Sequence, residues 1–537
     1  MNKKNFIAFV SFFTILYVIR LILSGYFSIG LLSDDYYNLF DAANSSLLQK
    51  FTGKLAFTNV LHLRPIYYIS IRLGYFIHSL AGLSFENFIN FRIGNLILFI
   101  LFAYISARLV FQLSGNYYLS ILAYLSILLY PPNAHNICWT AGRVDILCGL
   151  FFALYLLYSF KYFENKKNPF QILSFISLVC LLLSKETGIT AFAVLVIFVL
   201  YFHGKKGLTK NKKIFIIHFA IIALYLVYKF TLGQMNISQS PGEGRTITFV
   251  KAMLGFVIPE DFLTLQYQLK ANNLTMLYYF VIFVGFSFVY FIYLFQFKIF
   301  KLIMFALLIA IVLVSPYVAA GYVRPQLMLI PFSMIVIFLS SAGTGKDKTH
   351  TAFRKASFIM FIPVLIFWAV LFSQNLYQWG NAYKLSIQNI SDIEAVNFDK
   401  SKINVVFGDR GRINQTFVCD KLTGAYNYWK YRQPAIKDTL YDIVLLGGLN
   451  DVSITKEIRY EKIDDTHFKI NTDDENLFLY IEGFNLNPEH RIYEDNKVKI
   501  EFSNFNYLKK PSSMLVTVKS ADVNCYLFNP GNVKRIN

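Results

Sequence analysis

Residues 169–203 read PFQILSFISLVCLLLSKETGITAFAVLVIFVLYFH, and this stretch decides the fold class. Two apolar runs, 169–184 and 187–203, follow each other with only a Ser-Lys-Glu step at 184–186 around their junction. About 20 apolar residues are enough for a helix to cross a bilayer. Two such runs with a sharp polar step between them predict a pair of membrane-spanning helices that meet at a membrane surface.

The composition of the whole chain agrees with a membrane protein. Of its 537 residues, 55% are hydrophobic and only 15% are charged, whereas a soluble domain has about 25% charged residues. Apolar stretches long enough to span recur along the first two thirds of the chain. They lie near 6–27, 88–111, 117–132, 144–160, 169–184, 187–203, 213–232, 276–297, 301–320, 325–341 and 356–375.

The charge is distributed unevenly between two parts of the chain. Residues 1–375 hold 30 Lys and Arg but 11 Asp and Glu, while residues 376–537 hold 21 of each, so the net charge of +19 belongs to the first part. The basic residues sit in short runs between apolar stretches, which is the positive-inside pattern and not a nucleic-acid patch. We therefore expect a transmembrane domain over 1–375, a separate polar domain over 376–537, and no nucleic-acid partner.

The polar domain is predicted to be mostly β. Its apolar runs are short, rich in β-branched and aromatic residues, and separated by Asn, Asp, Gly and Pro. These runs are INVVF, DIVLLGG, NLFLYIEG, KVKIEF and MLVTVK.

One further segment, 64–82, is long enough to span but carries Arg72 near its middle. A central Arg costs about 2.5–3.5 kcal/mol on insertion scales, so a helix lying in the interface suits this segment better. Without it, an even number of crossings separates every basic run from the next. Eleven spans result, with the N-terminus in the cytoplasm and the C-terminal domain outside it.

This topology gathers the remaining polar features of the first part on the outer face. They are a long first loop at 28–87, a short second loop at 132–143, a third at 233–275, the Ser-Lys-Glu step at 184–186, and the turn at 321–324. Ionisable groups at membrane depth are costly and mark functional sites by default. The outer face is therefore where we look for chemistry.

Three acidic positions on this face are candidates. An acidic pair lies in LLSDDYYNLF at 31–40, Asp145 follows Arg143 by two residues, and Glu186 stands beside Lys185. Structural alternatives exist for each. The pair can cap an interfacial helix, Arg143 can pair with Asp145, and Lys185 and Glu186 can form an interfacial ion pair.

Six motifs follow one another along the chain. They are Asp34 and Asp35, Arg64-Pro65, Arg92 with Asn95, His135…Trp139…Gly142-Arg143-x-Asp145, the Ser-Lys-Glu step, and Tyr322-x-Arg324…Pro331. In this order they resemble the GT-C membrane glycosyltransferases, particularly the polyprenyl-phosphate-mannose O-mannosyltransferases and the aminoarabinose transferases of lipid A. The resemblance covers roughly residues 6–340.

One departure concerns the acceptor. The tail shows no 34-residue helical period, so no tetratricopeptide array follows the membrane part. A protein acceptor of the eukaryotic type is therefore not implied, and a bacterial enzyme that modifies a surface glycan, a lipid or a secreted protein is equally compatible. The expected location is the bacterial inner membrane, or the endoplasmic reticulum membrane in a eukaryote.

The resemblance implies an inverting transfer of a sugar from a polyprenyl-phosphate donor to an acceptor hydroxyl on the extracytoplasmic face. It makes Asp34 the leading general base and Asp35 a site acid or metal ligand, although the two can exchange roles. Asp145 would support the acceptor or a metal. A divalent metal ion at Asp35 and Asp145 is thus an open alternative, and no other cofactor is expected.

The cations on the same face suit the leaving phosphate. Arg64, Lys185 and Arg324 are expected to hold it, with Glu186 orienting Lys185. His135, Arg143 and Asp145 are expected to support the site.

Two other classes of protein remain open. A secondary transporter can use buried acids for ion coupling, although its external loops are usually shorter than 28–87. A non-catalytic membrane scaffold would need none of these residues.

Overall fold

A computed structural model describes most of the helical part of the chain and the strands that follow it. The described residues are 3–32, 35–53, 63–83, 87–232, 245–256, 299–321, 323–342, 350–396, 399, 401–409, 412–413, 416–417, 440–445, 459–471, 491–503, 513–529 and 532–536. The chain separates into two compact units. The first is Met1–Ile29 with Asp41–Tyr377, and the second is Gly30–Phe40 with Gln378–Asn537.

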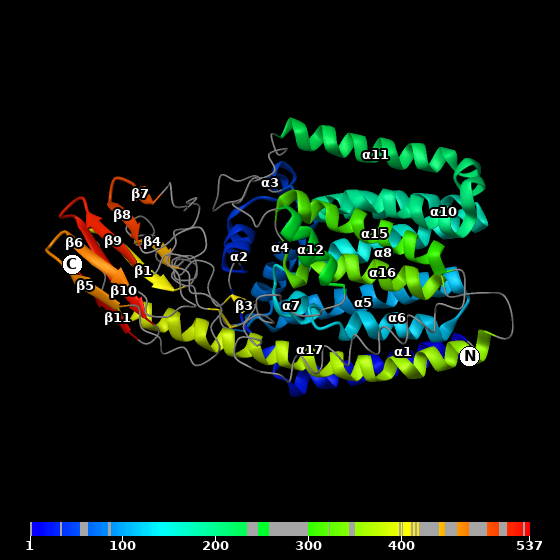
Figure 1. The fold of residues 1–537 in the computed structure, drawn as a ribbon, viewed down its shortest axis with the longest axis horizontal. Coiled ribbons are helices and arrows are strands. Elements are labelled where there is room, and N and C mark those ends of the chain that lie inside the picture. Colours follow the sequence, from blue (N-terminus) through cyan, green and yellow to red (C-terminus); the bar gives the residue numbers. More distant parts are fainter. Residues whose placement is uncertain are drawn as a thin grey trace. The chain divides into compact units, whose positions relative to one another are not determined.

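The first unit is a bundle of apolar helices that run side by side (Figure 1). Seven described helices are long and apolar enough to cross a membrane, and three shorter ones are apolar. The described helices of this unit are α1 (Lys3–Leu23), η1 (Tyr26–Ser28), α3 (Leu47–Thr52), α4 (Pro65–Leu80), α5 (Ile89–Ser114), α6 (Tyr117–Leu129), α7 (Asn133–Cys138), α8 (Arg143–Asn165), α9 (Asn168–Ser184), η2 (Glu186–Ile189), α10 (Thr190–Lys210), α11 (Lys212–Thr231), α12 (Arg245–Leu254), α15 (Ile299–Ala320), η3 (Pro325–Met328) and α16 (Leu329–Ala342). Two further helices cross the division between the units, α2 (Asp35–Asn44) and α17 (His350–Glu394).

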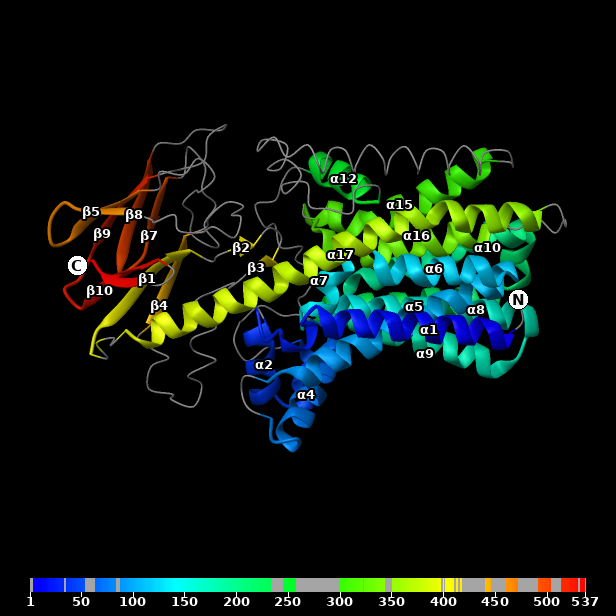
Figure 2. The same ribbon diagram turned by 90° about the horizontal axis from the view of Figure 1, so that it is seen from below.

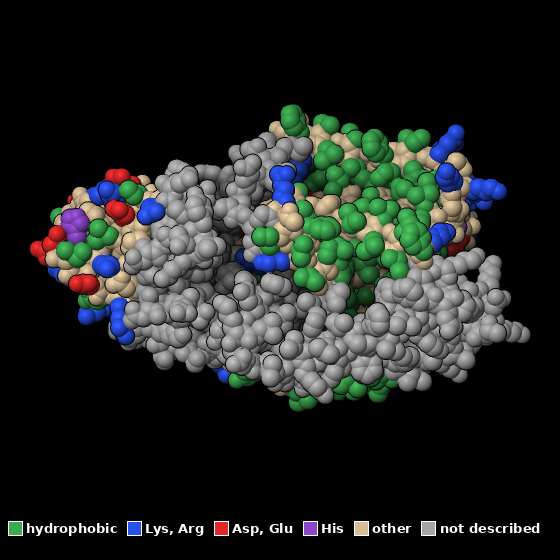
Figure 3. All heavy atoms as spheres, viewed as in Figure 1, with side chains coloured by type: hydrophobic (Ala, Val, Ile, Leu, Met, Phe, Trp, Pro, Cys, Tyr) green, Lys and Arg blue, Asp and Glu red, His purple; other side chains and the backbone are tan. Residues whose placement is uncertain are grey.

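Ten of the eleven predicted spans coincide with described helices. The eleventh, 276–297, lies outside the described residues. The surface agrees with a membrane setting, because hydrophobic side chains cover the visible face of the helices while Lys and Arg lie toward their ends (Figure 3). The chain is an integral membrane protein.

Helix α8 is the centre of the bundle. Of the helices long enough to span, it is the most deeply buried among those described, and it packs against both α5 and α9. Gly149 lets it approach α5, since a Cβ there would lie 3.1 Å from the ring of Phe102. The residues at the first turn of α8 are therefore held in a rigid frame.

Helix α4 is the segment predicted to lie in the interface. It is helical from Pro65 to Leu80, and Pro65 occupies its first turn, where no backbone donor is lost. It runs obliquely to the long helices (Figure 2). It is not among the helices long and apolar enough to cross a membrane.

The second unit contains the predicted β structure. A mixed sheet has the order β11-β10-β1-β4, in which β1 lies parallel to both neighbours, and a five-stranded antiparallel sheet has the order β5-β6-β9-β8-β7. The strands are β1 (Ile403–Asp409), β2 (Arg412–Ile413), β3 (Thr416–Phe417), β4 (Leu440–Leu445), β5 (Arg459–Lys462), β6 (His467–Asn471), β7 (Ile492–Glu494), β8 (Val498–Ser503), β9 (Ser513–Val518), β10 (Val523–Asn529) and β11 (Asn532–Arg535).

The two sheets share one hydrophobic core. Phe407 of β1 and Phe468 of β6 meet edge to face, with ring centroids 5.7 Å apart. Four of the five predicted runs overlap strands β1, β4, β8 and β9, and the run NLFLYIEG at 476–483 lies outside the described residues. β-Branched and aromatic residues thus indicated strands correctly in this unit.

Candidate active site

The Ser-Lys-Glu step forms the junction between α9 and η2. Helix α9 ends at Ser184, and Lys185 has an extended backbone with φ −157° and ψ 142° before η2 begins at Glu186. Neighbouring side chains on extended backbone point in opposite directions. Lys185 and Glu186 therefore contact different partners.

Lys185 pairs with Asp145. Its Nζ lies 2.5 Å from Asp145 Oδ1, and both side chains are buried. Asp145 stands in the first turn of α8, where the positive end of the helix dipole favours a carboxylate. The Lys185 ammonium also lies 5.8 Å from the ring centroid of Tyr317 in α15. This pair joins α8, the α9–η2 junction and α15 at one point.

Glu186 pairs with Arg64 through two parallel hydrogen bonds. Arg64 donates from Nε to Oε2 at 3.0 Å and from Nη2 to Oε1 at 2.6 Å. The two side chains are 23% and 41% exposed, so the pair is more open to its surroundings than Lys185 and Asp145. Burial on its own would lower the pKa of Arg64, but the Glu186 carboxylate more than reverses this and raises it.

These contacts correct one expectation. Glu186 was expected to orient Lys185, but Glu186 forms its ion pair with Arg64, and Lys185 forms its ion pair with Asp145. Among the described contacts, Glu186 therefore makes no ion pair with Lys185. The structure does bring Arg64, Asp145, Lys185 and Glu186 together.

The side chain of Arg143 links three helices. Its Nε donates to Asn95 Oδ1 at 2.6 Å, and its Nη1 and Nη2 donate to the carbonyls of Ser70 and Phe91 at 2.9 and 3.2 Å. All three guanidinium nitrogens thus tie the start of α8 to α4 and α5. The side chain supports the site by fixing these helices and not through the Asp145 carboxylate.

The other motif residues of this region are also structural anchors. Arg92 of α5 is fully buried and donates to the backbone carbonyls of Ile29 and Cys138. Asn95 donates to the carbonyls of Ile137 and Trp139 at 3.3 and 2.9 Å. The Arg-x-x-Asn pattern therefore fixes the backbone that leads to α8.

His135 and Arg324 lie on adjoining segments. His135 is buried in α7, and Arg324 precedes η3 with extended backbone. The Asn136 amide donates to the carbonyl of Gln326 at 3.1 Å, which holds α7 against η3. The loop expected at 132–143 and the turn at 321–324 are thereby connected.

The acidic pair is only partly described. Asp34 lies outside the described residues. Asp35 occupies the first turn of α2, is fully buried, and accepts a hydrogen bond from the backbone N–H of Leu32 at 3.3 Å. The roles of Asp34 as base and of Asp35 as acid or metal ligand stay predictions.

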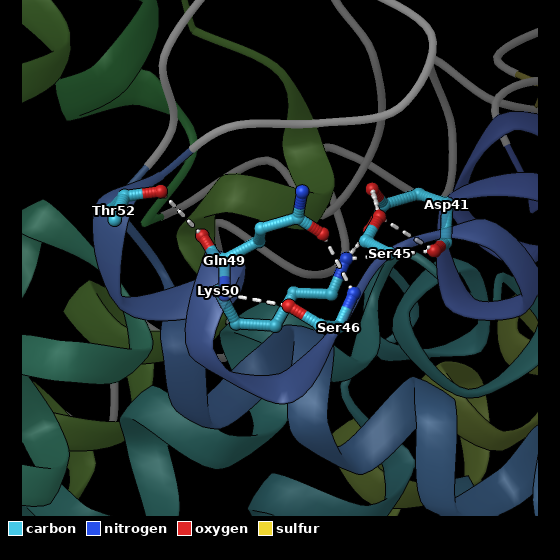
Figure 4. Close-up of polar contacts among 6 residues, drawn as sticks. All are labelled: Asp41, Ser45, Ser46, Gln49, Lys50 and Thr52. Atoms are coloured by element: carbon cyan, nitrogen blue, oxygen red, sulfur yellow. Dashed lines mark hydrogen bonds and ion pairs between the residues drawn. The ribbon is translucent and has the colours of Figure 1, made fainter.

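A further buried ion pair was missed by the sequence reasoning. Lys50 of α3 contacts the carboxylate of Asp41 in α2, and Ser45 donates to the same side chain (Figure 4). Lys50 and Asp41 are 0% and 1% exposed. The Lys50 ammonium lies 5.6 Å from the ring centroid of Tyr68, one helical turn after Arg64. Asp41 belongs to the polar first loop at 28–87, and nothing in its flanking sequence indicates burial.

The sequence left open a divalent metal ion at Asp35 and Asp145. Within the described ranges, no group of three or more His, Cys, Asp or Glu side chains is placed to hold a metal ion. The ammonium of Lys185 contacts one oxygen of Asp145, and a cation there would be repelled by it. The donor set described around Asp145 does not fit a divalent ion, so we derive no step through one.

Comparisons with known proteins give distant structural matches. No protein-family model and no curated protein matches the sequence. ArnT from Cupriavidus metallidurans in the apo state matches with 10% identity over 81% of this chain and 93% of that chain, at a TM-score of 0.42. The arabinofuranosyltransferase AftD from Mycobacteria matches with 13% identity over 77% of this chain and 32% of that chain, at 0.44. Likeness at this level is too distant to carry an argument about fold or activity.

Proposed function

We propose that this protein is a membrane glycosyltransferase of the GT-C type, which transfers a sugar from a polyprenyl-phosphate donor to an acceptor hydroxyl on the extracytoplasmic face. One observation carries the proposal. Two ion pairs from α4, α8 and the α9–η2 junction lie at one end of the helical bundle, and the pair of Lys185 and Asp145 is buried. Ionisable groups at membrane depth are costly and mark functional sites by default.

The position of this cluster supports an extracytoplasmic site. Asp145 begins α8, whereas Lys161, Lys166 and Lys167 lie at or beyond its other end. The 23 residues of α8 extend about 34 Å at 1.5 Å per residue, close to the hydrocarbon thickness of a bilayer. Lysine-rich ends belong in the cytoplasm by the positive-inside rule, so the cluster belongs on the opposite side.

The cations suit a phosphate leaving group. Arg64 uses two of its five N–H groups for Glu186. Because the guanidinium is planar and rigid, these two hydrogen bonds also fix the directions of the remaining N–H groups. Lys185 is held by Asp145, so both cations are oriented before a donor arrives. Positive charge placed in advance stabilises the phosphate as negative charge develops on it. Arg324 is assigned to the same role.

The proposed transfer is a single displacement at the anomeric carbon of the donor sugar. Asp34 accepts the proton of the acceptor hydroxyl, and the acceptor oxygen forms a bond to the anomeric carbon from the face opposite the phosphate. The bond between that carbon and the phosphate oxygen breaks, and its electron pair leaves on the polyprenyl phosphate. The anomeric configuration is inverted. The donor sugar and the acceptor, whether glycan, lipid or protein, are left to experiment.

The test is a donor assay. Purified full-length protein in bilayer nanodiscs is incubated with a panel of radiolabelled polyprenyl-phosphate sugars and membrane extract, and the label is followed into product and free sugar. Transfer from one donor, lost in Asp34→Asn, supports the proposal. A lack of transfer together with solute uptake into proteoliposomes would replace it with a transporter.

A further inference from the structure

Helix α4 has two distinct faces. Its buried face contains Tyr68, Ile71 and His78. The opposite face carries an exposed apolar stripe, hereafter the α4 stripe, at helical spacing. Its members are Leu73, Phe76, Ile77 and Leu80, which are 57%, 57%, 46% and 71% exposed. A short amphipathic helix of this kind lies in the plane of a membrane interface.

The neighbouring helix α3 extends the apolar surface. Leu47, Leu48 and Phe51 are all exposed on it, while Lys50 is fully buried and approaches Tyr68 of α4. The two helices pack against each other. Together the two helices expose hydrophobic side chains from both α3 and α4.

Arg72 stands directly beside the α4 stripe. Its Nη1 is buried and makes no hydrogen bond, and no ion pair to Arg72 is found among the described residues. A buried donor without an acceptor costs about 1–3 kcal/mol, and more when the group is charged. The guanidinium therefore lacks a negatively charged partner that would satisfy it.

The Asp41 carboxylate already has partners of its own. Asp41 is contacted by Lys50 and Ser45. The pKa of Lys50 is lowered, chiefly by burial and to a lesser extent by the charge of Arg72, which places Arg72 close to this pair. Among the described residues, Lys50 is paired with Asp41 and Arg64 with Glu186, whereas no carboxylate is paired with Arg72.

We propose that Arg72 and the α4 stripe form a binding site for an anionic phospholipid of the bilayer, with the lipid phosphate at Arg72 and an acyl chain along Leu73, Phe76, Ile77 and Leu80. Charge complementarity selects the phosphate, because a guanidinium binds phosphate oxygens through paired N–H groups. The adjoining apolar stripe selects a ligand with a hydrocarbon chain over a soluble anion. This site is independent of the proposed transferase activity.

The test is native mass spectrometry of the full-length protein released from a neutral detergent. Phosphatidylglycerol is titrated against phosphatidylcholine, with inorganic phosphate in a separate arm. We expect phosphatidylglycerol adducts to exceed phosphatidylcholine adducts, and Arg72→Gln to reduce the former at least fivefold. Arg72→Lys should retain part of the binding. Arg108→Gln is the matched control, because Arg108 is a half-buried arginine on α5 that donates to Tyr104.

Three results would overturn the site. If the Arg72→Gln variant binds phosphatidylglycerol as well as the unchanged protein does, Arg72 is not part of the site. If inorganic phosphate displaces the lipid, the ligand of the site is a soluble anion and not a phospholipid. Displacement by polyprenyl phosphate at equal concentration would assign the surface to substrate and not to a bilayer lipid. If Arg72→Gln fails to fold, Phe76→Ser with Leu80→Ser tests the stripe, and undiminished binding there contradicts the proposal equally.

Discussion

At the scale of single residues, the central feature is that neighbours in sequence serve different partners. Lys185 contacts Asp145 at depth, and Glu186 contacts Arg64 nearer the surface. Each cation is thus held by one carboxylate in a defined direction. A donor phosphate that arrives between them would meet two oriented positive groups without waiting for a side chain to reorganise.

The buried pair gives the first prediction. Lys185→Met leaves Asp145 buried without its partner, and breaking a buried pair in this way costs about 3–5 kcal/mol. The double variant Lys185→Met with Asp145→Asn should recover most of this stability, since no unpaired charge remains. Thermal unfolding in detergent measures the recovery.

The same double variant separates structure from function. If Lys185 holds the donor phosphate, restored stability will not restore transfer, and activity should stay reduced by at least a hundredfold. A stable double variant with near-normal turnover would make the pair purely structural.

The forked pair gives the second prediction. Arg64→Lys keeps the charge but cannot form two parallel hydrogen bonds with Glu186. We expect the KM for donor to rise by roughly tenfold, which corresponds to about 1.4 kcal/mol, with a smaller change in kcat. Steady-state kinetics over a donor series measure this, with Arg108→Lys as control. An unchanged KM would remove Arg64 from donor binding.

At this scale, the residues that could be predicted are those whose charge is energetically costly at membrane depth. Lys185, Glu186 and Asp145 stand out in the sequence because charged residues are rare among apolar helices. Their pairing could not be predicted, because it depends on how α4 and α8 approach the α9–η2 junction. Lys50 and Asp41 were missed for the same reason. Charged residues are common in a polar segment, so the sequence does not show that these two are buried and paired.

At the scale of elements, α8 is held from its first turn. Arg143 donates to α5 and to the carbonyl of Ser70 in α4, and it places Asp145 two residues later. Hydrophobic pattern predicted the helix but not this anchor, because Arg143 beside Asp145 suggested a local pair. The strands of the tail were easier, since β-branched runs between turn residues need no long-range partner to be recognised.

The third prediction concerns this anchor. Arg143→Met removes three hydrogen bonds and leaves Asn95 Oδ1 and two carbonyls with fewer donors, so we expect the free energy of unfolding to fall by about 3 kcal/mol or more. Arg143→Lys should recover less than half. Differential scanning fluorimetry of the purified protein measures the loss. A variant as stable as the unchanged protein would show that these contacts do not hold the helices.

At the scale of the whole molecule, charge divides the chain. The excess of Lys and Arg lies in residues 1–375, at the ends of apolar helices, and the tail is balanced. That division predicted a membrane part and a polar tail, and the short β-branched and aromatic runs predicted strands in the tail. The described residues contain both the apolar helices and the strands. It also predicts on which side of the membrane the tail lies.

The fourth prediction tests that side. Ser520→Cys places a thiol in an exposed turn of the tail, and Thr209→Cys places one at the lysine-rich end of α10. In intact cells an impermeant maleimide should label the first and not the second until the membrane is permeabilised. Labelling of the unchanged protein gives the background from its own cysteines. The reverse pattern would discard an extracytoplasmic site.

The measurement that tests the central claim most directly is release of polyprenyl phosphate from a radiolabelled polyprenyl-phosphate sugar by purified protein, compared with Asp34→Asn at equal folded amount. The amide keeps the shape of the side chain but cannot accept the acceptor's proton. We predict acceptor-dependent release by the unchanged protein and at least a thousandfold slower release by the variant. Equal release by both proteins, or none from any donor in the presence of membrane acceptors, would contradict the assignment as a glycosyltransferase with an acidic base at this position.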